Sequence, residues 1–291
     1  MQKGVPQIMD ITSIKSVLHD LSEEVLPSRF ETAQQPEPNI IQFCLRGINS
    51  QTWIEVSWNS DSARILKINR PEKIGAESTL SKQLRYGLKY MALVTIEQDK
   101  FERVIKFGFA KKPGDEINKY LIFELMGKHS NIFYLDNNQK IIAVGKQINS
   151  NQSSFRTVST GSIYSEPPKN MKKEPSPNES YETWKESISS VPESLKYCLI
   201  NTYQGVSPIL TKQLETFSNL GSVEIMNKNI DFISETNLKK IYQSWKIWIE
   251  RFNKNNFNFS IFDNFFYSVW FLKNEIINKD NIDQILSLIH I

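Results

Sequence analysis

A change in periodicity near residue 165 divides the chain and limits what it can fold into. Before this point, short apolar runs alternate with Gly, Asn, Ser and Asp, which is typical of antiparallel strands. The segment SEPPKNMKKEPSPNES, residues 165–180, is crowded with Pro, Ser, Lys and Asn and carries no periodicity. Beyond it, the apolar spacing is mainly helical. We predict a β-rich domain at 1–168, a linker at 169–180, a helical domain at 181–255 and the start of a further unit at 256–291.

The first part of the chain is expected to be a sheet with flanking helices. DITSIKSVLHDLSEEVL predicts a helix, with Asp10 as the N-cap acceptor, and STLSKQLRYGLKYM predicts a second one. After a loop at QQPEPN, eight segments have strand composition: NIIQFCLRG, QTWIEVSW, ARILKI, ALVTIEQ, ERVIKFGFA, KYLIFEL, NIFYLD and KIIAVGKQ. The predicted class is α+β, with an antiparallel β-sandwich or flattened barrel.

The second part is expected to be mainly helical. Helices are predicted at YETWKESISS, SLKYCLINTY, ETNLKKIYQSWKIWIERF and, as a short pair, around GVSPILTKQLETF. The Trp and Phe stripe of ETNLKKIYQSWKIWIERF favours a core-facing helix over a platform for stacking bases. The later stretch NFNFSIFDNFFYSVWF has the composition of strands.

Composition excludes several classes of protein. The 291 residues are 40% apolar, and the net charge is only +3, so any nucleic-acid site must be local. Two distant cysteines, Cys44 and Cys198, and three histidines give no metal-ligand spacing and no disulfide framework. We expect no cofactor. No run of eighteen apolar residues occurs, and the N-terminal MQKGVPQIMD lacks the apolar run of a signal peptide, so we expect a soluble cytoplasmic protein.

An acidic residue interrupts the apolar strand KYLIFELM. Strand alternation places Glu124 on one face with Tyr120, Ile122 and Met126. A buried unpaired carboxylate costs several kcal/mol, so Glu124 needs a partner. Arg103, which begins the apolar stripe of the preceding strand, is the predicted partner. Such a pair either only stabilises the fold or also positions the arginine for a ligand, and the spacing alone leaves both alternatives open.

Several motifs, in order, resemble the NFACT family of ribosome-quality-control proteins. They are ELMGKHSN, IFYLD, GSIYSEPP and GVSPILTKQL, and the resemblance runs from about Asp10 to Leu214. It implies an N-terminal domain like that of formamidopyrimidine-type DNA glycosylases, followed by a helix-hairpin-helix unit. It also implies binding to a large ribosomal subunit that carries an obstructed peptidyl-tRNA. Alanyl-tRNA would be recruited there, and the stalled chain would receive an untemplated alanine tail.

The same resemblance implies which residues meet tRNA or ribosome. Its Asp-Arg pair falls on Glu102 and Arg103, with a longer acid here than in the family, and its Glu-Leu-Met triplet is found unchanged. Arg103 would contact phosphate or base, and Glu124 would orient it. For His129, in the turn GKHSN, the alternative to a binding role is that of an ordinary turn residue whose hydrogen bonds are made within the protein. The tRNA- and ribosome-binding residues expected are Asp10, Glu102, Arg103, Glu124, Leu125, Met126, Lys128 and His129.

The hairpin GVSPILTKQL is expected to contact phosphate through Gly205, Ser207 and Lys212, with an ordinary solvated lysine as the alternative for Lys212. We expect a non-enzymatic factor, because the chain has neither the N-terminal proline and glutamate nor the four-cysteine zinc tail of the glycosylases. A generic RNA-binding module and a fibronectin-binding adhesin are the alternatives, and a DNA-processing enzyme is a more remote one. The family's long coiled coil and C-terminal RNA-binding domain have no counterpart by Ile291, which suggests a fragment or a truncated form.

Overall fold

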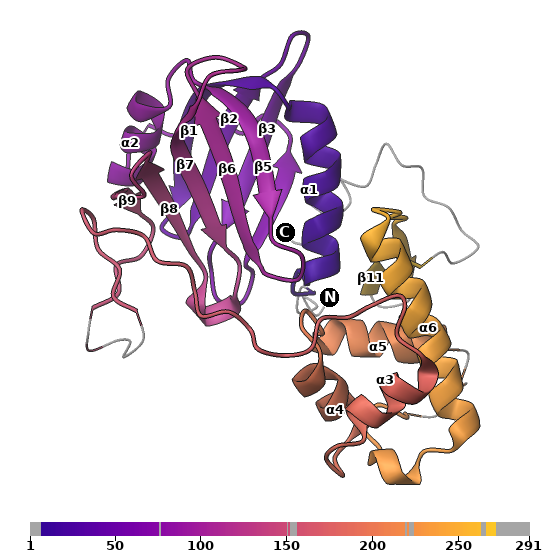
Figure 1. Ribbon diagram of the computed structural model, residues 1–291. Helices are drawn as coiled ribbons and strands as arrows, with labels where there is room; N and C mark the ends of the chain where they lie inside the picture. Colours follow the sequence, from indigo (N-terminus) through magenta and orange to yellow (C-terminus); the bar gives the residue numbers. More distant parts are fainter. Residues whose placement is uncertain are drawn as a thin grey trace, which may run out of the picture. The chain divides into compact units, whose positions relative to one another are not determined.

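The computed structural model describes residues 7–75, 77–149, 151, 156–218, 220, 224–262 and 266–271. It divides into two compact units, which Figure 1 shows as ribbons. The sheet unit is Val17–Pro168. The helix-rich unit combines the described residues up to Ser16 with those of 169–271. The units meet at residue 168, where the prediction ends the β-rich domain, but the described residues up to Ser16 belong with the helix-rich unit and not with the sheet.

The sheet unit contains one nine-stranded antiparallel sheet, so the predicted α+β class with a large antiparallel sheet is confirmed. The strand order is β4-β3-β2-β1-β5-β6-β7-β8-β9. The strands are β1 Ser28–Glu37, β2 Ile40–Arg46, β3 Gln51–Ser57, β4 Arg64–Ile68, β5 Ala92–Gln98, β6 Val104–Ala110, β7 Ile117–Glu124, β8 Asn131–Asp136 and β9 Ile141–Val144.

Strand β1 is missing from the sequence prediction, which placed a loop at QQPEPN. Its residues SRFETAQQPE lack apolar alternation, and Pro36 lies near its end. Pairing with neighbours on both sides, rather than intrinsic propensity, holds this segment extended: β1 pairs with β2 along its length and with β5 at Ser28 and Arg29.

Aromatic residues show that the sheet folds over on itself. Phe43 on β2 and Phe123 on β7 lie four strand positions apart, about 19 Å in a flat sheet. Their ring centroids are nevertheless 6.3 Å apart, and Phe107 on β6 packs edge-on against both. One face of the curved sheet therefore encloses the core.

Two helices accompany the sheet. Helix α1, Ile11–Val25, begins at the predicted cap, and Glu24 near its end accepts a hydrogen bond from Thr52 of β3 at 2.7 Å. Helix α2, Thr79–Gly87, is shorter than predicted. A side chain at Gly87 would meet the Tyr134 hydroxyl, with only 2.2 Å between them, so only glycine fits where α2 meets β8.

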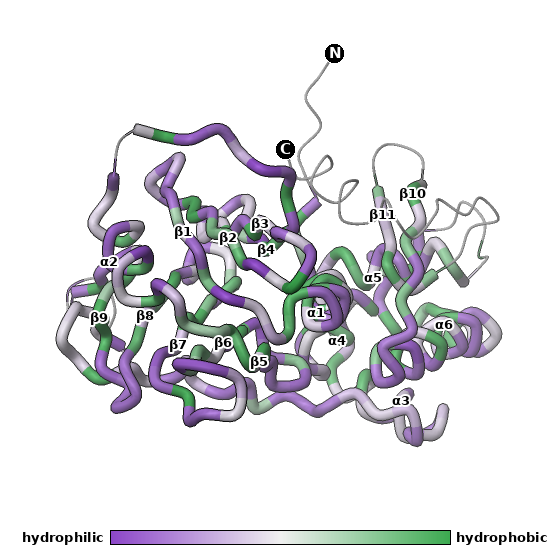
Figure 2. The backbone as a smooth tube through the Cα atoms, turned by 90° about the horizontal axis from the view of Figure 1, so that it is seen from above, coloured by the Kyte–Doolittle hydropathy of each residue, from purple (hydrophilic) through white to green (hydrophobic). Residues whose placement is uncertain are grey.

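The helix-rich unit has a core of aromatic residues. Its helices are α3 Tyr181–Ile188, α4 Leu195–Thr202, α5 Pro208–Phe217 and α6 Glu235–Asn253, with 3-10 turn η2 Ile230–Phe232 and strands β10 Ser260–Phe262 and β11 Phe266–Ser268. Hydrophilic and hydrophobic colours change repeatedly along α6 in Figure 2, as expected of an amphipathic helix. Its Trp245 and Trp248 are fully buried, which confirms that the aromatic stripe faces a core.

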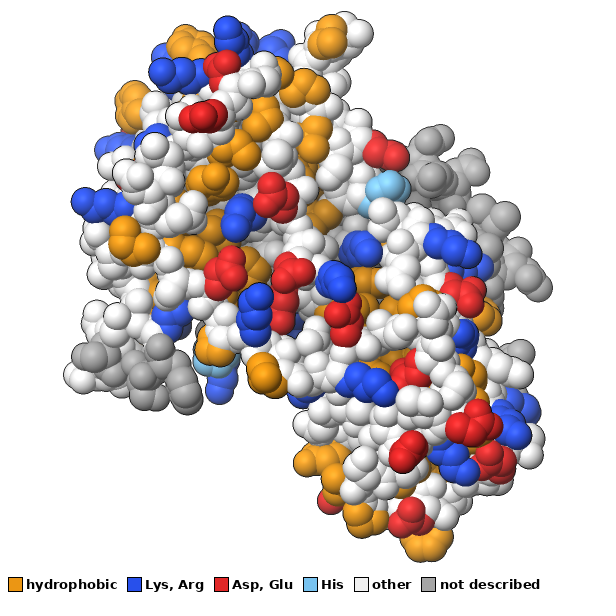
Figure 3. Space-filling view, viewed as in Figure 1, with side chains coloured by type: hydrophobic (Ala, Val, Ile, Leu, Met, Phe, Trp, Pro, Cys, Tyr) orange, Lys and Arg blue, Asp and Glu red, His pale blue; other side chains and the backbone are white. Residues whose placement is uncertain are grey.

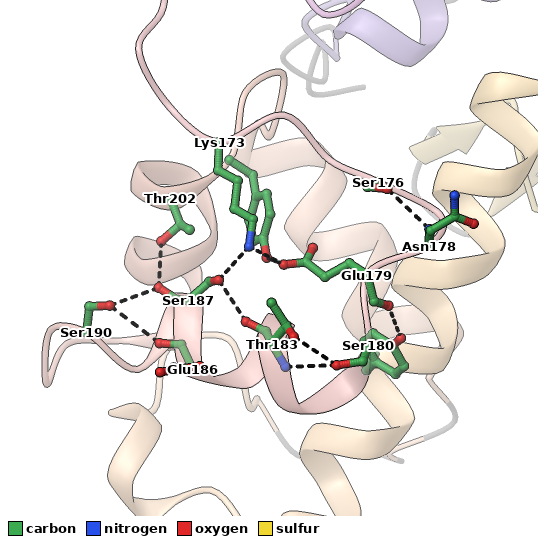
Figure 4. A network of polar contacts seen from close by, with 12 residues as sticks. Lys173, Ser176, Asn178, Glu179, Ser180, Thr183, Glu186, Ser187, Ser190 and Thr202 are labelled. Carbon is green, nitrogen blue, oxygen red and sulfur yellow. Dashed lines mark hydrogen bonds and ion pairs between the residues drawn. The ribbon is translucent and has the colours of Figure 1, made fainter.

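Residues 169–180 are not the free linker that their composition suggests. The buried carboxylate of Glu179 forms an ion pair with Lys173 (Figure 4). It also accepts a hydrogen bond from the Tyr203 hydroxyl at 2.8 Å. The Tyr242 hydroxyl donates to the backbone carbonyl of Glu179. The carboxylate and the backbone carbonyl of Glu179 thus attach this segment to the end of α4 and to α6. Composition alone does not reveal these contacts.

The sequence predicts the start of a further unit at 256–291. The described residues of 256–271, including β10 and β11, belong to the helix-rich unit, where Tyr267 exchanges backbone hydrogen bonds with the side chain of Gln7. Residues 272–291 lie outside the described part of the chain.

Candidate nucleic-acid interface

Glu124, at the end of β7, is buried with a partner that the sequence did not suggest. Its carboxylate accepts a hydrogen bond from the Arg156 guanidinium at 2.7 Å and one from the Tyr164 hydroxyl at 2.8 Å. Only 2% of Glu124 is exposed, and burial raises its pKa while Arg156 opposes that rise. The guanidinium also lies over the rings of Phe133 and Tyr164, at 5.3 and 5.5 Å.

The predicted pair between Arg103 and Glu124 is therefore wrong, and strand register gives the reason. Val104 of β6 lies directly opposite Glu124, so these two side chains share a face of the sheet. Arg103 comes one residue earlier and projects to the opposite face. What links the segments there is a backbone hydrogen bond of 2.9 Å from Leu125 N–H to the carbonyl of Arg103. Glu124 consequently does not orient Arg103.

Arg103 lies at the rim of the aromatic core face. Ile105 and Phe107 follow it on that face, as predicted, and both are fully buried. The Arg103 side chain itself is partly exposed, and within the part of the chain described its guanidinium forms no ion pair or hydrogen bond. A cation in this position keeps all its donors for a ligand.

The turn between β7 and β8 brings two more basic side chains to this end of the sheet. Gly127 has φ +57° and begins the 3-10 turn η1, Gly127–His129, in which Lys128 and His129 are exposed. Leu125, by contrast, is a core residue, and Met126 is half-buried. Of the Glu-Leu-Met triplet, only Met126 therefore has a partly exposed side chain that a ligand can contact.

The hairpin that carries this turn is fixed from its other side. Asn131, opposite Glu124 in the register, donates its amide to the carbonyl of Lys146 and accepts from the Lys146 N–H, each at 2.8 Å. Glu102, which precedes Arg103, lies in a turn in which its backbone N–H donates a hydrogen bond of 2.7 Å to the carbonyl of Asp99. The Glu102 side chain is half-exposed. Arg103, Lys128 and His129 are thus presented by fixed backbone.

Asp10 has a structural role in the other unit. It is 2% exposed, and its carboxylate accepts hydrogen bonds from the N–H of Ser13 at 2.9 Å and from the Ser13 hydroxyl at 2.7 Å. This confirms the predicted N-cap of α1. Contact with RNA through the same carboxylate remains a prediction.

The predicted phosphate contact lies between α4 and α5. Gly205 has φ +71°, and the buried Ser207 caps α5 by accepting a hydrogen bond from Leu210 N–H at 3.1 Å. The Ser207 hydroxyl is thus already engaged by the helix. Lys212 is exposed, with its ammonium group 4.9 Å from the centre of the Phe266 ring. Whether this hairpin meets phosphate stays a prediction.

Sequence reasoning missed Arg156 and Tyr164 as the partners of Glu124. Tyr164 lies within the motif GSIYSEPP, but the place of a residue in a motif does not show which strand its side chain packs against. Arg156 lies in a polar stretch without periodicity, 32 residues from Glu124. The signal available was the buried acid itself, which requires a cation without naming it.

Charges of both signs are mixed over the surface. In the view of Figure 3, acidic side chains stand among the lysines and arginines, in agreement with the small net charge. Among the described residues, no three His, Cys, Asp or Glu side chains are grouped to hold a metal ion. No helix in the described ranges has both the length and the apolar character needed to cross a membrane.

Comparison with known proteins identifies relatives. "Rqc2 homolog RqcH" of Streptococcus pneumoniae is 31% identical over 156 residues, which cover 52% of this chain and 28% of that protein. The Bacillus subtilis protein of the same name is 26% identical over 199 residues, 67% of this chain and 35% of that protein. The matched region thus spans about a third of these relatives' length.

Solved structures show the same fold. The N-terminal part of the fibronectin/fibrinogen-binding protein from Streptococcus suis superposes with a TM-score of 0.70 at 22% identity, over 96% of this chain and 97% of that one. The fibrinogen binding protein from Staphylococcus aureus gives 0.68 at 19% identity, over 93% of both chains. The family model of the NFACT N-terminal and middle domains matches residues 10–290. The chain therefore belongs to the NFACT family.

Proposed function

We propose that this protein binds tRNA and an obstructed large ribosomal subunit, and that it recruits alanyl-tRNA for untemplated alanine tailing of the stalled chain. Membership of the NFACT family and likeness to proteins named RqcH support this proposal. Peptide transfer would belong to the ribosome, so the protein would act in the cytoplasm as a binding factor and not as an enzyme.

The proposal for tRNA binding rests on the position and exposure of Arg103. Its side chain is partly exposed at the end of the β6–β7 pair, with the exposed Lys128 and His129 in the adjoining turn. A guanidinium offers five donors in a planar fork, which suits phosphate oxygens and base edges. Single-stranded loops of RNA expose both of these groups. The anticodon loop of a tRNA is a ligand of this kind.

Replacing Arg103 by alanine is expected to weaken tRNA binding by about 1–3 kcal/mol, roughly 5- to 150-fold, because one multidentate contact is lost. Arg103 has no ion pair in the described part of the protein, so thermal stability should stay unchanged. Fluorescence anisotropy with labelled tRNA measures the affinity. Arg85→Ala removes a partly exposed arginine of α2 and serves as the matched control. Equal affinities of the two variants would contradict the assignment.

The choice of RNA separates this proposal from a generic RNA-binding module. Sequencing of the RNA that copurifies with the full chain is expected to show strong enrichment of alanine tRNA over bulk RNA. A generic module would return RNAs in proportion to their abundance. That result would leave the family membership intact but would remove the proposed recruitment of alanyl-tRNA.

A further inference from the structure

A basic cleft of about 460 Å³ lies at the end of the sheet opposite to Arg103. Arg103 precedes β6, whereas Lys111 and Lys112 of the cleft follow its last residue. Arg29 at the start of β1 and Arg46 at the end of β2 face each other in the register and complete the basic lining. Strands β1 and β2 are neighbours in the sheet, and β5, whose first residue Ala92 also lines the cleft, lies between β1 and β6 (Figure 1).

The positive charge of this cleft is only partly neutralised. The carboxylate of Glu31 pairs with both arginines. It forms an ion pair with Arg46, and its oxygen lies 3.6 Å from a guanidinium nitrogen of Arg29. Lys111 and Lys112 are exposed, and in the described part of the chain neither has an acidic partner. Two of the four cations of the cleft thus share one carboxylate and two have none in the described part of the chain, which leaves an excess of positive charge for an anionic ligand.

An exposed aromatic ring stands beside these cations. Tyr90, which also lines the cleft, is 65% exposed and has φ +67°, a backbone conformation that costs free energy for a residue other than glycine. The Arg29 guanidinium lies 5.8 Å from the centre of its ring, and the ammonium group of Lys89 lies 5.0 Å away. This geometry holds a flat apolar surface open to solvent between positive charges.

We propose that the cleft binds unpaired nucleotides of RNA, with phosphates on the arginines and lysines and a base stacked on Tyr90. Proteins bind single strands by combining a positively charged groove with aromatic side chains. The volume suits a small number of ligand groups, because ligand pockets measure about 300–1,000 Å³. An acidic peptide would satisfy the cations but would leave the ring without a stacking partner. The inference goes beyond the proposed function, because it requires neither a tRNA fold nor Arg103.

Binding of fluorescein-labelled decauridylate to the full chain, measured by anisotropy, tests the stacking contact. Tyr90→Ala is expected to weaken binding about 5- to 150-fold, which corresponds to the loss of one base-stacking contact. Tyr90→Phe keeps the ring and should bind as the wild type does. Tyr86→Ala is the matched control, because Tyr86 is 70% exposed with Arg85 over its ring but does not line the cleft.

Salt dependence tests the charged contacts. The double variant Lys111→Gln/Lys112→Gln is expected to reduce the slope of log affinity against log salt by about 1.4, since each single-strand phosphate contact contributes about 0.7. Lys73→Gln/Lys140→Gln, two exposed lysines of the same unit that do not line the cleft, should leave the slope unchanged.

Three results would overturn the proposal: no binding of decauridylate by the wild type, equal losses in Tyr90→Ala and Tyr86→Ala, or binding of labelled decaglutamate in its place. The last result would make the cleft a peptide site. Failure of the tRNA proposal is a separate outcome, because it is read from Arg103→Ala with tRNA. Thermal melting of every variant confirms that the fold is retained.

Discussion

Replacement of Arg156 by alanine is expected to lower the free energy of unfolding of the sheet unit by about 3–5 kcal/mol. The Arg156 side chain is 14% exposed, and its guanidinium is the cationic partner of Glu124 at 2.7 Å. Its removal leaves an almost fully buried carboxylate with the Tyr164 hydroxyl as the donor shown at that site. An ionised group in such surroundings is far more costly than the pair that it replaces, because water cannot reach it.

The loss should depend on pH in a defined direction. Burial raises the pKa of Glu124 above its ordinary value of 4.5, and loss of the opposing Arg156 raises it further. A carboxyl group with a raised folded pKa stabilises the fold fully below its unfolded pKa and loses that contribution as the pH rises through the folded pKa. The deficit of Arg156→Ala should therefore be greatest at neutral pH and shrink as the pH is lowered towards 4.5.

Urea unfolding at a series of pH values measures this deficit. The double variant Arg156→Ala/Glu124→Gln provides the control, because a neutral amide no longer requires a cation. It should regain much of the lost stability at neutral pH and lose the pH dependence. If the double variant were as unstable as Arg156→Ala at every pH, packing of the arginine stem and not its charge would be the cause.

Trp245→Ala is expected to destabilise the helix-rich unit by about 3–5 kcal/mol, the usual cost of removing a large buried aromatic side chain. The indole of Trp245 is fully buried, and its ring centre lies 4.7 Å from that of Tyr203 and 5.0 Å from that of Trp248. Its loss opens a cavity among three neighbouring aromatic groups, because Trp184 also packs against it.

Tryptophan fluorescence and far-UV circular dichroism during urea unfolding measure the effect. Ile247→Ala is the matched control on the same helix, because Ile247 is 42% exposed and should cost little. Since Arg156 and Trp245 belong to different units, the two substitutions should act on different parts of the unfolding curve where the units unfold separately. Equal effects of Trp245→Ala and Ile247→Ala would contradict the described core of α6.

Local patterns predict this protein well where local forces decide its structure. The Asp10 cap of α1 and the helical periods of α1 and α6 are local features, and all are found as predicted. The alternation that places Ile122 and Glu124 on one face of β7 is also local. Strand β1 was missed because partners on both sides, and not its own composition, hold it extended. The same applies to residues 169–180, where Glu179 binds groups that are distant in the sequence.

The candidate site shows the same limit. The residues of the turn, Lys128 and His129, are exposed as a turn predicts. The partner of Glu124 could not be derived from the sequence. Proximity along the chain favoured Arg103, but in the strand register Val104 lies opposite Glu124, so Arg103 is one residue out of position and points to the other face. The alternation rule contained this answer once the pairing of Val104 with Glu124 was known. Only the pairing itself was missing.

The helix-rich unit is discontinuous, and this affects the order in which the chain acquires its structure during synthesis. Gln7 and Tyr267 are 260 positions apart, and Thr12 accepts a hydrogen bond from Trp248, 236 positions later. The sheet unit is continuous from Val17 to Pro168 and can complete its hydrogen bonds while the ribosome is still translating. The leading residues must therefore wait until Trp248 and Tyr267 have been synthesised, so the helix-rich unit closes only after the whole of Val17–Pro168 has been made.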